Sequence, residues 1–212
     1  MGAKQSSANV TFSKPGTSTD KSGYIWVAPL GTALPADATT ELAPAFVGLG
    51  YLSEDGLTEP ASLTAGDDIV AAGGDTVAQA DPTFSKTWTG TCIEALNEDL
   101  LKVAYGYANV DVVPASAAKD GSITIKEKAS EIEHHVIVID EMLKGGRKRR
   151  NVMADATFLI TGDISHVHTA LVNFEFTINA YPAADQPAQI QYITIPKSAS
   201  SQKSDVDSHR IR

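Results

Sequence analysis

The chain has 212 residues, of which 42% are hydrophobic, a formal net charge of -9 and a single cysteine, Cys92. This length and apolar content predict one globular domain with a real core. The single cysteine excludes an intrachain disulfide and fits a reducing compartment, and the lack of an 18-residue apolar run predicts no membrane-spanning helix.

Both ends of the sequence are polar. Residues 1–22 are rich in Ser, Thr, Lys and Gly, and residues 197–212 read "KSASSQKSDVDSHRIR". Neither segment can bury enough apolar surface to offset the entropy lost on ordering. We therefore expect an N-terminal arm over 1–22 and a C-terminal arm over 197–212, each either disordered or ordered on a partner. Residues 23–196 form the predicted domain.

The pattern between the arms is mostly that of strands. In residues 83–94 the order Phe84, Lys86, Trp88, Gly90, Cys92 alternates with Ser and Thr, which predicts one buried face. Two glycines in 46–53 indicate a bulge or close packing. The predicted strands are 24–28, 46–53, 83–94, 122–128, 133–143, 151–162 and 170–182, with 189–196 as one more candidate.

One helix is predicted, over residues 95–106. Its expected apolar stripe consists of Leu96, Leu100, Leu101 and Ala104. Asn97 is a candidate N-cap, and Gly106 is a candidate left-handed C-terminal cap. A helix this short is marginal alone, so it must pack on a sheet. The expected fold is mainly β: an antiparallel β-sandwich or partly closed barrel with one flanking α-helix.

Residues 54–82 carry acidic residues and no basic one. A weakly structured segment of this length is unusual inside a domain and tends to be functional. We expect a long acidic loop or a loose hairpin that projects from the body, with "TVAQA" as the place for a short strand. The acidity extends further, because residues 30–121 contain 14 Asp and Glu against 3 Lys and Arg.

A basic run interrupts this acidic sequence between two predicted strands, in "EMLKGGRKRRN" at 141–151. Its position predicts the tip or the wide end of a hairpin. Three interpretations stay open: a solvated loop, a nucleic-acid contact, or a contact with an acidic surface of another copy. A nucleic-acid contact is disfavoured, because no aromatic residues are interleaved with the cations and no recognition helix follows the run. The expected contact residues are Lys144, Arg147, Lys148, Arg149 and Arg150 on the basic side and Glu54, Asp55, Glu59, Asp67 and Asp68 on the acidic side.

Catalytic and metal-binding patterns are weak. Cys92 lies mid-strand among apolar neighbours, which favours an inert core thiol. His134 and His135 are adjacent and point to opposite faces of a strand. His166 and His168 with Asp163 could bind a transition metal or form a polar turn. We expect no catalytic residue, no cofactor and no metal.

The stretch 22–58 contains the turn residues Pro29, Gly31, Thr32 and Pro35, followed by "LGYLSEDGLT" at 49–58. Downstream come "WTGTCIEALNEDLLKVAYG" and then "ADATFLITGD" with "LVNFEFTINAYP". In this order, these segments resemble the opening, the strand-then-helix segment and the last hairpin of the major tail tube proteins of long-tailed, non-contractile bacteriophages. The resemblance spans roughly residues 22–195.

The resemblance implies a structural subunit of a virion tail, synthesised in the bacterial host cytoplasm. It implies six copies in a ring and rings stacked into a hollow tube, through which double-stranded DNA passes without specific binding. The implied partners are further copies of the chain, the tape measure, the tail terminator and the tip or baseplate proteins. Two rival hypotheses stay open: a virion-surface binding module, immunoglobulin-like or carbohydrate-binding, and a metal-dependent hydrolase.

Overall fold

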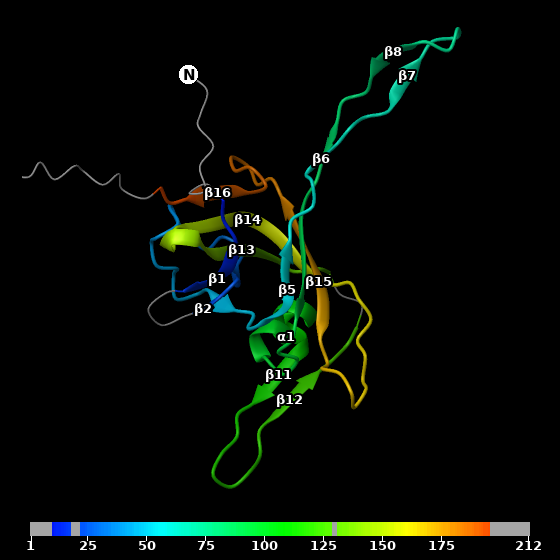
Figure 1. The fold of residues 1–212 in the computed structure, drawn as a ribbon. Coiled ribbons are helices and arrows are strands. Elements are labelled where there is room, and N and C mark those ends of the chain that lie inside the picture. The colour runs from blue at the N-terminus through cyan, green and yellow to red at the C-terminus, as the bar shows by residue number, and fades with distance from the viewer. Residues whose placement is uncertain (1–9, 18–21, 129–130, 196–212) are drawn as a thin grey trace, which may run out of the picture.

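The computed structural model describes residues 10–17, 22–128 and 131–195, and its described strands are antiparallel (Figure 1). The strands are β1 (Ser13–Thr17), β2 (Ser22–Gly23), β3 (Ile25–Pro29), β4 (Val47–Gly48), β5 (Leu52–Thr58), β6 (Leu63–Thr64), β7 (Asp68–Val70), β8 (Thr76–Gln79), β9 (Thr83–Phe84), β10 (Lys86–Cys92), β11 (Val110–Val113), β12 (Ser122–Ile125), β13 (His134–Leu143), β14 (Lys148–Ile160), β15 (Phe174–Tyr181) and β16 (Ile190–Ile193). The helical elements are α1 (Glu98–Tyr105) and the 3-10 turns η2 (Tyr107–Asn109) and η3 (Lys144–Gly146).

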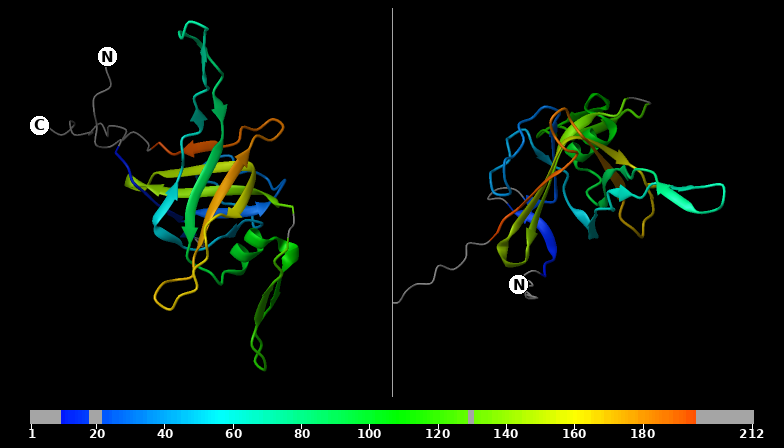
Figure 2. Two further views of the ribbon diagram at one scale, coloured as in Figure 1. Left: turned by 90° about the vertical axis from the view of Figure 1, so that its right-hand side faces the viewer. Right: turned by 90° about the horizontal axis from the view of Figure 1, so that it is seen from above.

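The main sheet contains ten of the described strands, and the longest of them, β14, belongs to two layers. Residues 149–152 of β14 pair with β16, whereas residues 155–160 pair with β15, which continues through β10 to β5. On its other side β14 pairs with β13, which also pairs with β3 and β1. Figure 2 shows the result as two layers whose strands cross. The predicted β-sandwich is confirmed, and the described strands do not close into a barrel.

Hydrophobic side chains are buried on both faces of the β3–β13 layer. Along β3, Ile25 and Val27 join the main core between the layers, while Trp26 and Ala28 join a smaller cluster on the outer face. Alternation in a strand produces this division, because successive side chains point to opposite faces. Phe46, at the end of the segment that follows β3, belongs to the outer cluster. This explains why the β3 sequence is continuously apolar.

Helix α1 lies at one end of the sandwich and confirms the predicted N-cap. The Asn97 side chain accepts hydrogen bonds from the backbone N–H groups of Asp99 and Leu100. Gly106 ends the helix with a positive φ of 92°, but its ψ of 137° lies outside the left-handed helical conformation that was predicted. Leu100 and Leu101 are buried in the main core. The prediction that Leu96 shares their stripe is wrong, because Leu96 precedes the helix and is 85% exposed.

The predicted acidic loop is a projecting hairpin. Its first residues, 54–58, belong to β5 within the main sheet, which corrects the predicted boundary. Beyond them, β6 pairs with β9 and β7 pairs with β8 to form a two-stranded extension, here called the ribbon (residues 59–85). A second hairpin, β11–β12, includes a strand that the sequence analysis missed. Figure 1 shows the two hairpins pointing away from opposite ends of the body.

Part of the predicted N-terminal arm belongs to the sheet. Residues 13–15 of β1 pair with residues 141–143 of β13, although this segment has no apolar alternation. Residues 1–9 and 18–21 of that arm lie outside the described residues. The predicted C-terminal arm, 197–212, also lies outside them.

Candidate functional site

The basic run sits at the β13–β14 connection, and the structure corrects its placement. The turn itself is short: η3 with Gly145 and Gly146, both at a positive φ, followed by Arg147. Lys148, Arg149 and Arg150 already belong to β14. Only Lys144 and Arg147 are therefore at the tip, and the other three cations lie on a strand whose neighbours are set by the sheet register.

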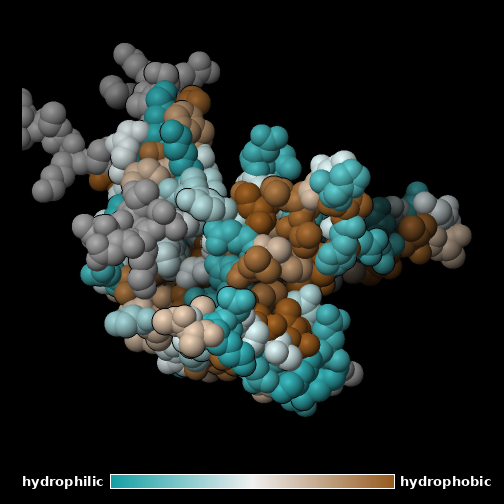
Figure 3. Space-filling model, turned by 90° about the horizontal axis from the view of Figure 1, so that it is seen from below, coloured by the Kyte–Doolittle hydropathy of each residue, from teal (hydrophilic) through white to brown (hydrophobic). Residues whose placement is uncertain are grey.

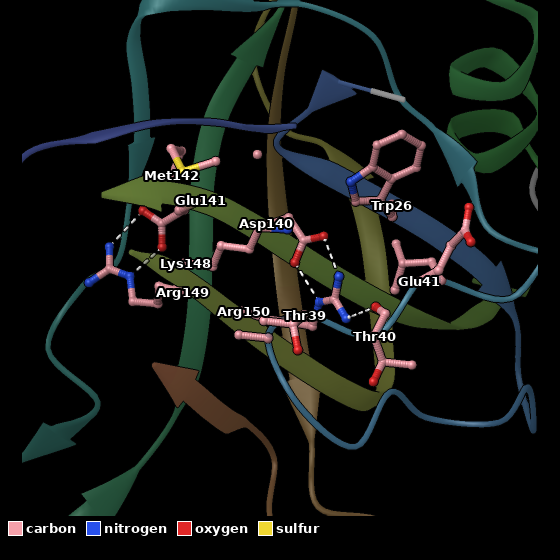
Figure 4. A pocket seen from close by; sticks show the side chains of 13 residues that line it. Trp26, Thr39, Thr40, Glu41, Asp140, Glu141, Met142, Lys148, Arg149 and Arg150 are labelled. Atoms are coloured by element: carbon pink, nitrogen blue, oxygen red, sulfur yellow. Dashed lines mark hydrogen bonds and ion pairs between the residues drawn. The ribbon is translucent and has the colours of Figure 1, made fainter. Parts of the chain in front are cut away.

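Arg150 is buried and satisfied within the chain. It is 5% exposed and lies opposite Asp140 in the β13–β14 register. Its Nε and Nη2 atoms donate to Asp140 Oδ1 and Oδ2 at 2.6 and 2.8 Å. Its Nη1 atom donates to the carbonyl oxygens of Asp37 at 3.0 Å and Thr40 at 2.7 Å. This side chain therefore ties the 37–40 turn to the sheet (Figure 4).

The turn that Arg150 contacts is itself ordered by a carboxylate. Asp37 Oδ1 accepts from the backbone N–H groups of Thr39 and Thr40, and both threonine hydroxyls also donate to this carboxylate. These hydrogen bonds, with Thr40 as the largest contributor, hold the pKa of Asp37 well below its ordinary value. The turn, β13 and β14 together surround a cavity of about 310 Å³, in which Figure 4 shows the Asp140–Arg150 pair.

Arg149 is paired in the same way with Glu141, which is 4% exposed. Its Nη2 atom donates to Glu141 Oε1 at 2.6 Å, and its Nε atom donates to Oε2. These hydrogen bonds raise the pKa of Arg149 above its ordinary value. Glu141 also accepts from Ser13 Oγ at 2.6 Å and from Asn151 Nδ2 at 3.3 Å. Glu141 thus joins β1, β13 and β14 through one buried carboxylate.

The sequence analysis missed Asp140 and Glu141 as partners, although a signal for them is present. In "DEMLKGGRKRR" the two acids and the two arginines lie equally far from Gly145 on either side. A hairpin centred on this glycine places Asp140 opposite Arg150 and Glu141 opposite Arg149. Opposite charges directly across antiparallel strands attract each other.

The other three basic residues of the run, Lys144, Arg147 and Lys148, form no ion pair in the part of the chain that the structure describes. Lys144 is exposed, Arg147 and Lys148 are half-buried, and no ion pair of these three occurs among the described residues. Lys148 donates its backbone N–H to Thr194 Oγ1 at 2.7 Å, which fixes the start of β14 but leaves the ammonium group unused.

The acidic candidates fall into two groups. Glu54, Asp55 and Glu59 border a cavity of about 260 Å³ that Arg149 and Glu141 also line, and Glu59 pairs with Lys86. Asp67 and Asp68 lie far out on the ribbon and are exposed. Within the described ranges no ion pair joins the predicted acidic set to Lys144, Arg147 or Lys148.

The residues considered for chemistry are separated. Cys92 is fully buried, and burial with the nearby Glu94 raises the pKa of its thiol to about 12. His134 is exposed beside Asp155, whereas His135 is buried, so the two histidines do point to opposite faces. Among the residues that the structure describes, no three His, Cys, Asp or Glu side chains come together as metal ligands. None of the described helices is long and apolar enough to cross a bilayer.

Comparison with protein families gives a match that covers most of the chain. Residues 16–202 match a family model described as "Phage tail tube protein". A comparison with curated proteins finds no match.

Proposed function

Because the chain belongs to the phage tail tube protein family and is a structural component of the virion tail, we propose that six copies close a ring and that rings stack into a hollow tube. Double-stranded DNA passes through this tube during genome ejection. The tape measure, the tail terminator and the tip or baseplate proteins are its other partners in the tail.

Besides the family match, the observation that carries this proposal is an edge strand of the main sheet that is left unpaired. The strand order ends at β5, whose outer edge has no partner strand among the described residues. Unpaired edges readily form hydrogen bonds with another chain. In a ring of copies, the edge of one subunit's sheet can pair with the next subunit. Such a head-to-tail contact produces a closed ring when the rotations between successive subunits add up to a full turn.

Charge supports a passage that does not retain DNA. The net charge is -9, and duplex DNA carries one negative charge per about 1.7 Å of its axis. Repulsion between the two acts over a Debye length of about 8–10 Å at physiological salt. An acidic wall therefore lets the duplex slide, whereas a cationic wall would bind it.

The charges that form no ion pair within the described part of the chain are available for contacts between copies. Lys144, Arg147 and Lys148 provide the basic side of this proposed contact, because Arg149 and Arg150 are already neutralised by their own strand partners. The exposed acids Glu54, Asp55, Asp67 and Asp68 provide the acidic side. Exposed ion pairs contribute only about 0–1 kcal/mol each. Their role is therefore to select the register and the partner rather than to hold the subunits together.

Negative-stain electron microscopy of the purified chain tests the proposal. Six-fold rings or tubes are the expected result, and a gel-shift assay at physiological salt should show no retention of duplex DNA. A preparation that stays monomeric at high protein concentration would contradict the ring, and tight DNA retention would contradict the non-adhesive passage.

A further inference from the structure

Three polar side chains from different parts of the sequence meet at the base of the ribbon. Lys86 is the first residue of β10, Glu59 directly follows β5, and Gln189 directly precedes β16. Glu59 Oε1 accepts a hydrogen bond from Lys86 Nζ and another from Gln189 Nε2, the latter at 3.3 Å. One carboxylate oxygen therefore contacts both an amine and a primary amide. Lys86 and Gln189 also line a common cavity of about 380 Å³. We call these three residues the triad.

The amide group of Gln189 is held at both of its ends. Its Oε1 atom accepts from Trp88 Nε1 at 2.8 Å, and its Nε2 atom also donates to Asn151 Oδ1 at 3.2 Å. Trp88 is 2% exposed and Asn151 is fully buried. A donor on a carbonyl oxygen stabilises negative charge that develops on this oxygen when a nucleophile attacks the carbon. The Gln189 carbonyl is therefore polarised in the direction that favours such an attack.

The Lys86 amine lies beside this amide and is largely removed from water. Its side chain is 10% exposed, and a lysine is rarely buried to this extent without a partner. Its Nζ atom lies 5.8 Å from the centre of the Trp88 ring and also donates to Ser62 Oγ at 3.2 Å. Trp88 thus contacts both reacting groups, because its ring faces the amine and its N–H group holds the amide.

We propose that Lys86 and Gln189 form an intramolecular isopeptide bond, with Glu59 as the carrier of protons. Glu59 takes a proton from the Lys86 ammonium group, and the neutral amine attacks Gln189 Cδ. A bond forms between Nζ and Cδ, while the Trp88 N–H group stabilises the charge on Oε1. Two protons of the original ammonium group pass through Glu59 to Nε2 as the Cδ–Nε2 bond breaks. The products are a side-chain amide and one ammonium ion, so no oxidant or other reactant is required.

The bond fastens the two layers of the sandwich together. It joins β10, in the layer that contains β15 and β5, to the residue before β16, which pairs with the other end of β14. It closes a loop of about 100 residues in the unfolded chain, and such a cross-link stabilises the folded state as a disulfide does. It also fixes the base of the ribbon, because Lys86 directly follows the ribbon. This inference goes beyond the proposed function and does not depend on it.

The reaction takes place within one copy of the chain. The ribbon and β16 lie on the same side of the body in Figure 1. Figure 3 shows the opposite end, where hydrophobic residues gather near the centre of the face. A contact between copies through that hydrophobic surface leaves the triad unchanged. The bond can therefore be measured whether or not the protein assembles, and a cross-linked protein that forms no rings or tubes would contradict the proposed function alone.

Intact-mass spectrometry of the purified full chain in denaturant tests the bond. We expect a mass lower than that of the unlinked chain by one ammonia, about 17 Da. Trypsin should not cleave after Lys86, because its side chain is then an uncharged amide, and the digest should contain one branched peptide with both Lys86 and Gln189. A full mass without this branched peptide would refute the proposal and leave Lys86 and Glu59 as an ion pair.

Variants assign the roles within the triad. Lys86→Arg keeps the positive charge but has no amine that can form the amide, so it should show the full mass. Glu59→Gln keeps the shape but cannot carry protons, so the cross-linked fraction should fall about tenfold or more. The matched control is Lys126→Arg, which changes a lysine that is paired with Asp111 elsewhere and should retain the loss of ammonia. Circular dichroism checks that each variant is folded.

Two outcomes of these variants would also overturn the proposal. A loss of ammonia that persists in Lys86→Arg would place the reaction at another residue. Complete cross-linking of Glu59→Gln would show that the carboxylate does not carry the protons. The mass of the unmodified chain remains decisive even if a variant fails to fold, because this measurement requires no substitution.

Discussion

The Arg150 guanidinium donates two parallel hydrogen bonds to the Asp140 carboxylate, at 2.6 and 2.8 Å, across the register that joins β13 to β14. Such bidentate pairs combine charge with a fixed geometry. The same side chain also contacts the carbonyl oxygens of the 37–40 turn, so it orders a segment far away in the sequence. A residue that belongs to an apparently exposed basic run is thus an internal structural element.

Replacement of Arg150 by Ala should therefore destabilise the monomer. Removing one partner of a buried pair costs about 3–5 kcal/mol, and we expect about 3 kcal/mol because the Asp140 side chain is 19% exposed. Urea denaturation measures the loss of unfolding free energy. The control is Asp140→Leu/Arg150→Met, which removes both charges and should recover the part of the loss that comes from the unpaired Asp140 carboxylate. A single variant within about 1 kcal/mol of the unmodified protein would show that the pair is unimportant.

Charge reversal at the hairpin tip should leave the stability of the monomer unchanged and weaken assembly instead. Lys144→Glu/Arg147→Glu changes two residues without an ion pair among the described residues, so circular dichroism and urea denaturation should be unchanged. Assembly into tubes should require a higher protein concentration, by about tenfold for each 1.4 kcal/mol of contact energy lost. Sedimentation and electron microscopy measure this shift.

The matched control reverses the charge on the other side of the same contact. Combining Lys144→Glu/Arg147→Glu with Asp67→Lys/Asp68→Lys should restore assembly, because the attraction returns with exchanged signs. Normal assembly of the first variant alone would show that the hairpin tip does not contact an acidic neighbour.

Stability should fall in mild acid because of His135. Its side chain is 3% exposed, and its Nε2 atom is buried without a hydrogen-bond partner among the described groups. Burial lowers the pKa of His135 below its ordinary value of 6.5, the nearby Glu133 opposes this shift, and His134 adds to it. The folded state therefore binds this proton more weakly than the unfolded chain does, and unfolding becomes easier as the pH drops below about 6.5.

Urea denaturation between about pH 5.5 and 7.5 measures this dependence. The effect is at most about 1.4 kcal/mol per pH unit and ends at the folded-state pKa. The variant His135→Gln should show a flatter pH profile over this range. Identical slopes for the two proteins would assign the acid sensitivity to other groups.

Cys92 should be inert while the protein is folded. Its thiol is fully buried and its pKa is raised to about 12, so almost no thiolate is present at neutral pH. A thiol reagent at about pH 8 should modify it only as fast as the protein unfolds, whereas the exposed Leu96→Cys thiol should react at once. Comparable rates at the two positions would contradict the burial of Cys92.

Sequence patterns predicted the fold class, the helix and its N-cap, because these follow from the periodicity and identity of neighbouring residues. The alternation around Trp88 and Cys92 predicted that they share one face, and both side chains are buried. Phe84, the first member of that predicted face, lies instead in β9 of the ribbon and is 59% exposed. Strand β1 could not be predicted in this way. Its sequence "SKPGT" has no β-branched alternation and becomes a strand through its pairing with β13. The extent of β5 was missed for the same reason, since its residues join the sheet by pairing with β10.

The identity and order of the charges, the apolar faces and the family resemblance were all readable along the chain. Which charges pair within the chain depended on the cross-strand register. Arg149 pairs with Glu141 and Arg150 pairs with Asp140, whereas Lys144 and Arg147 form no ion pair among the described residues. Likewise, the chain order does not reveal that the ribbon and the β11–β12 hairpin point away from opposite ends of the body. Local preferences act between neighbouring residues, but charge pairing and the positions of surfaces are set by contacts between segments far apart in sequence.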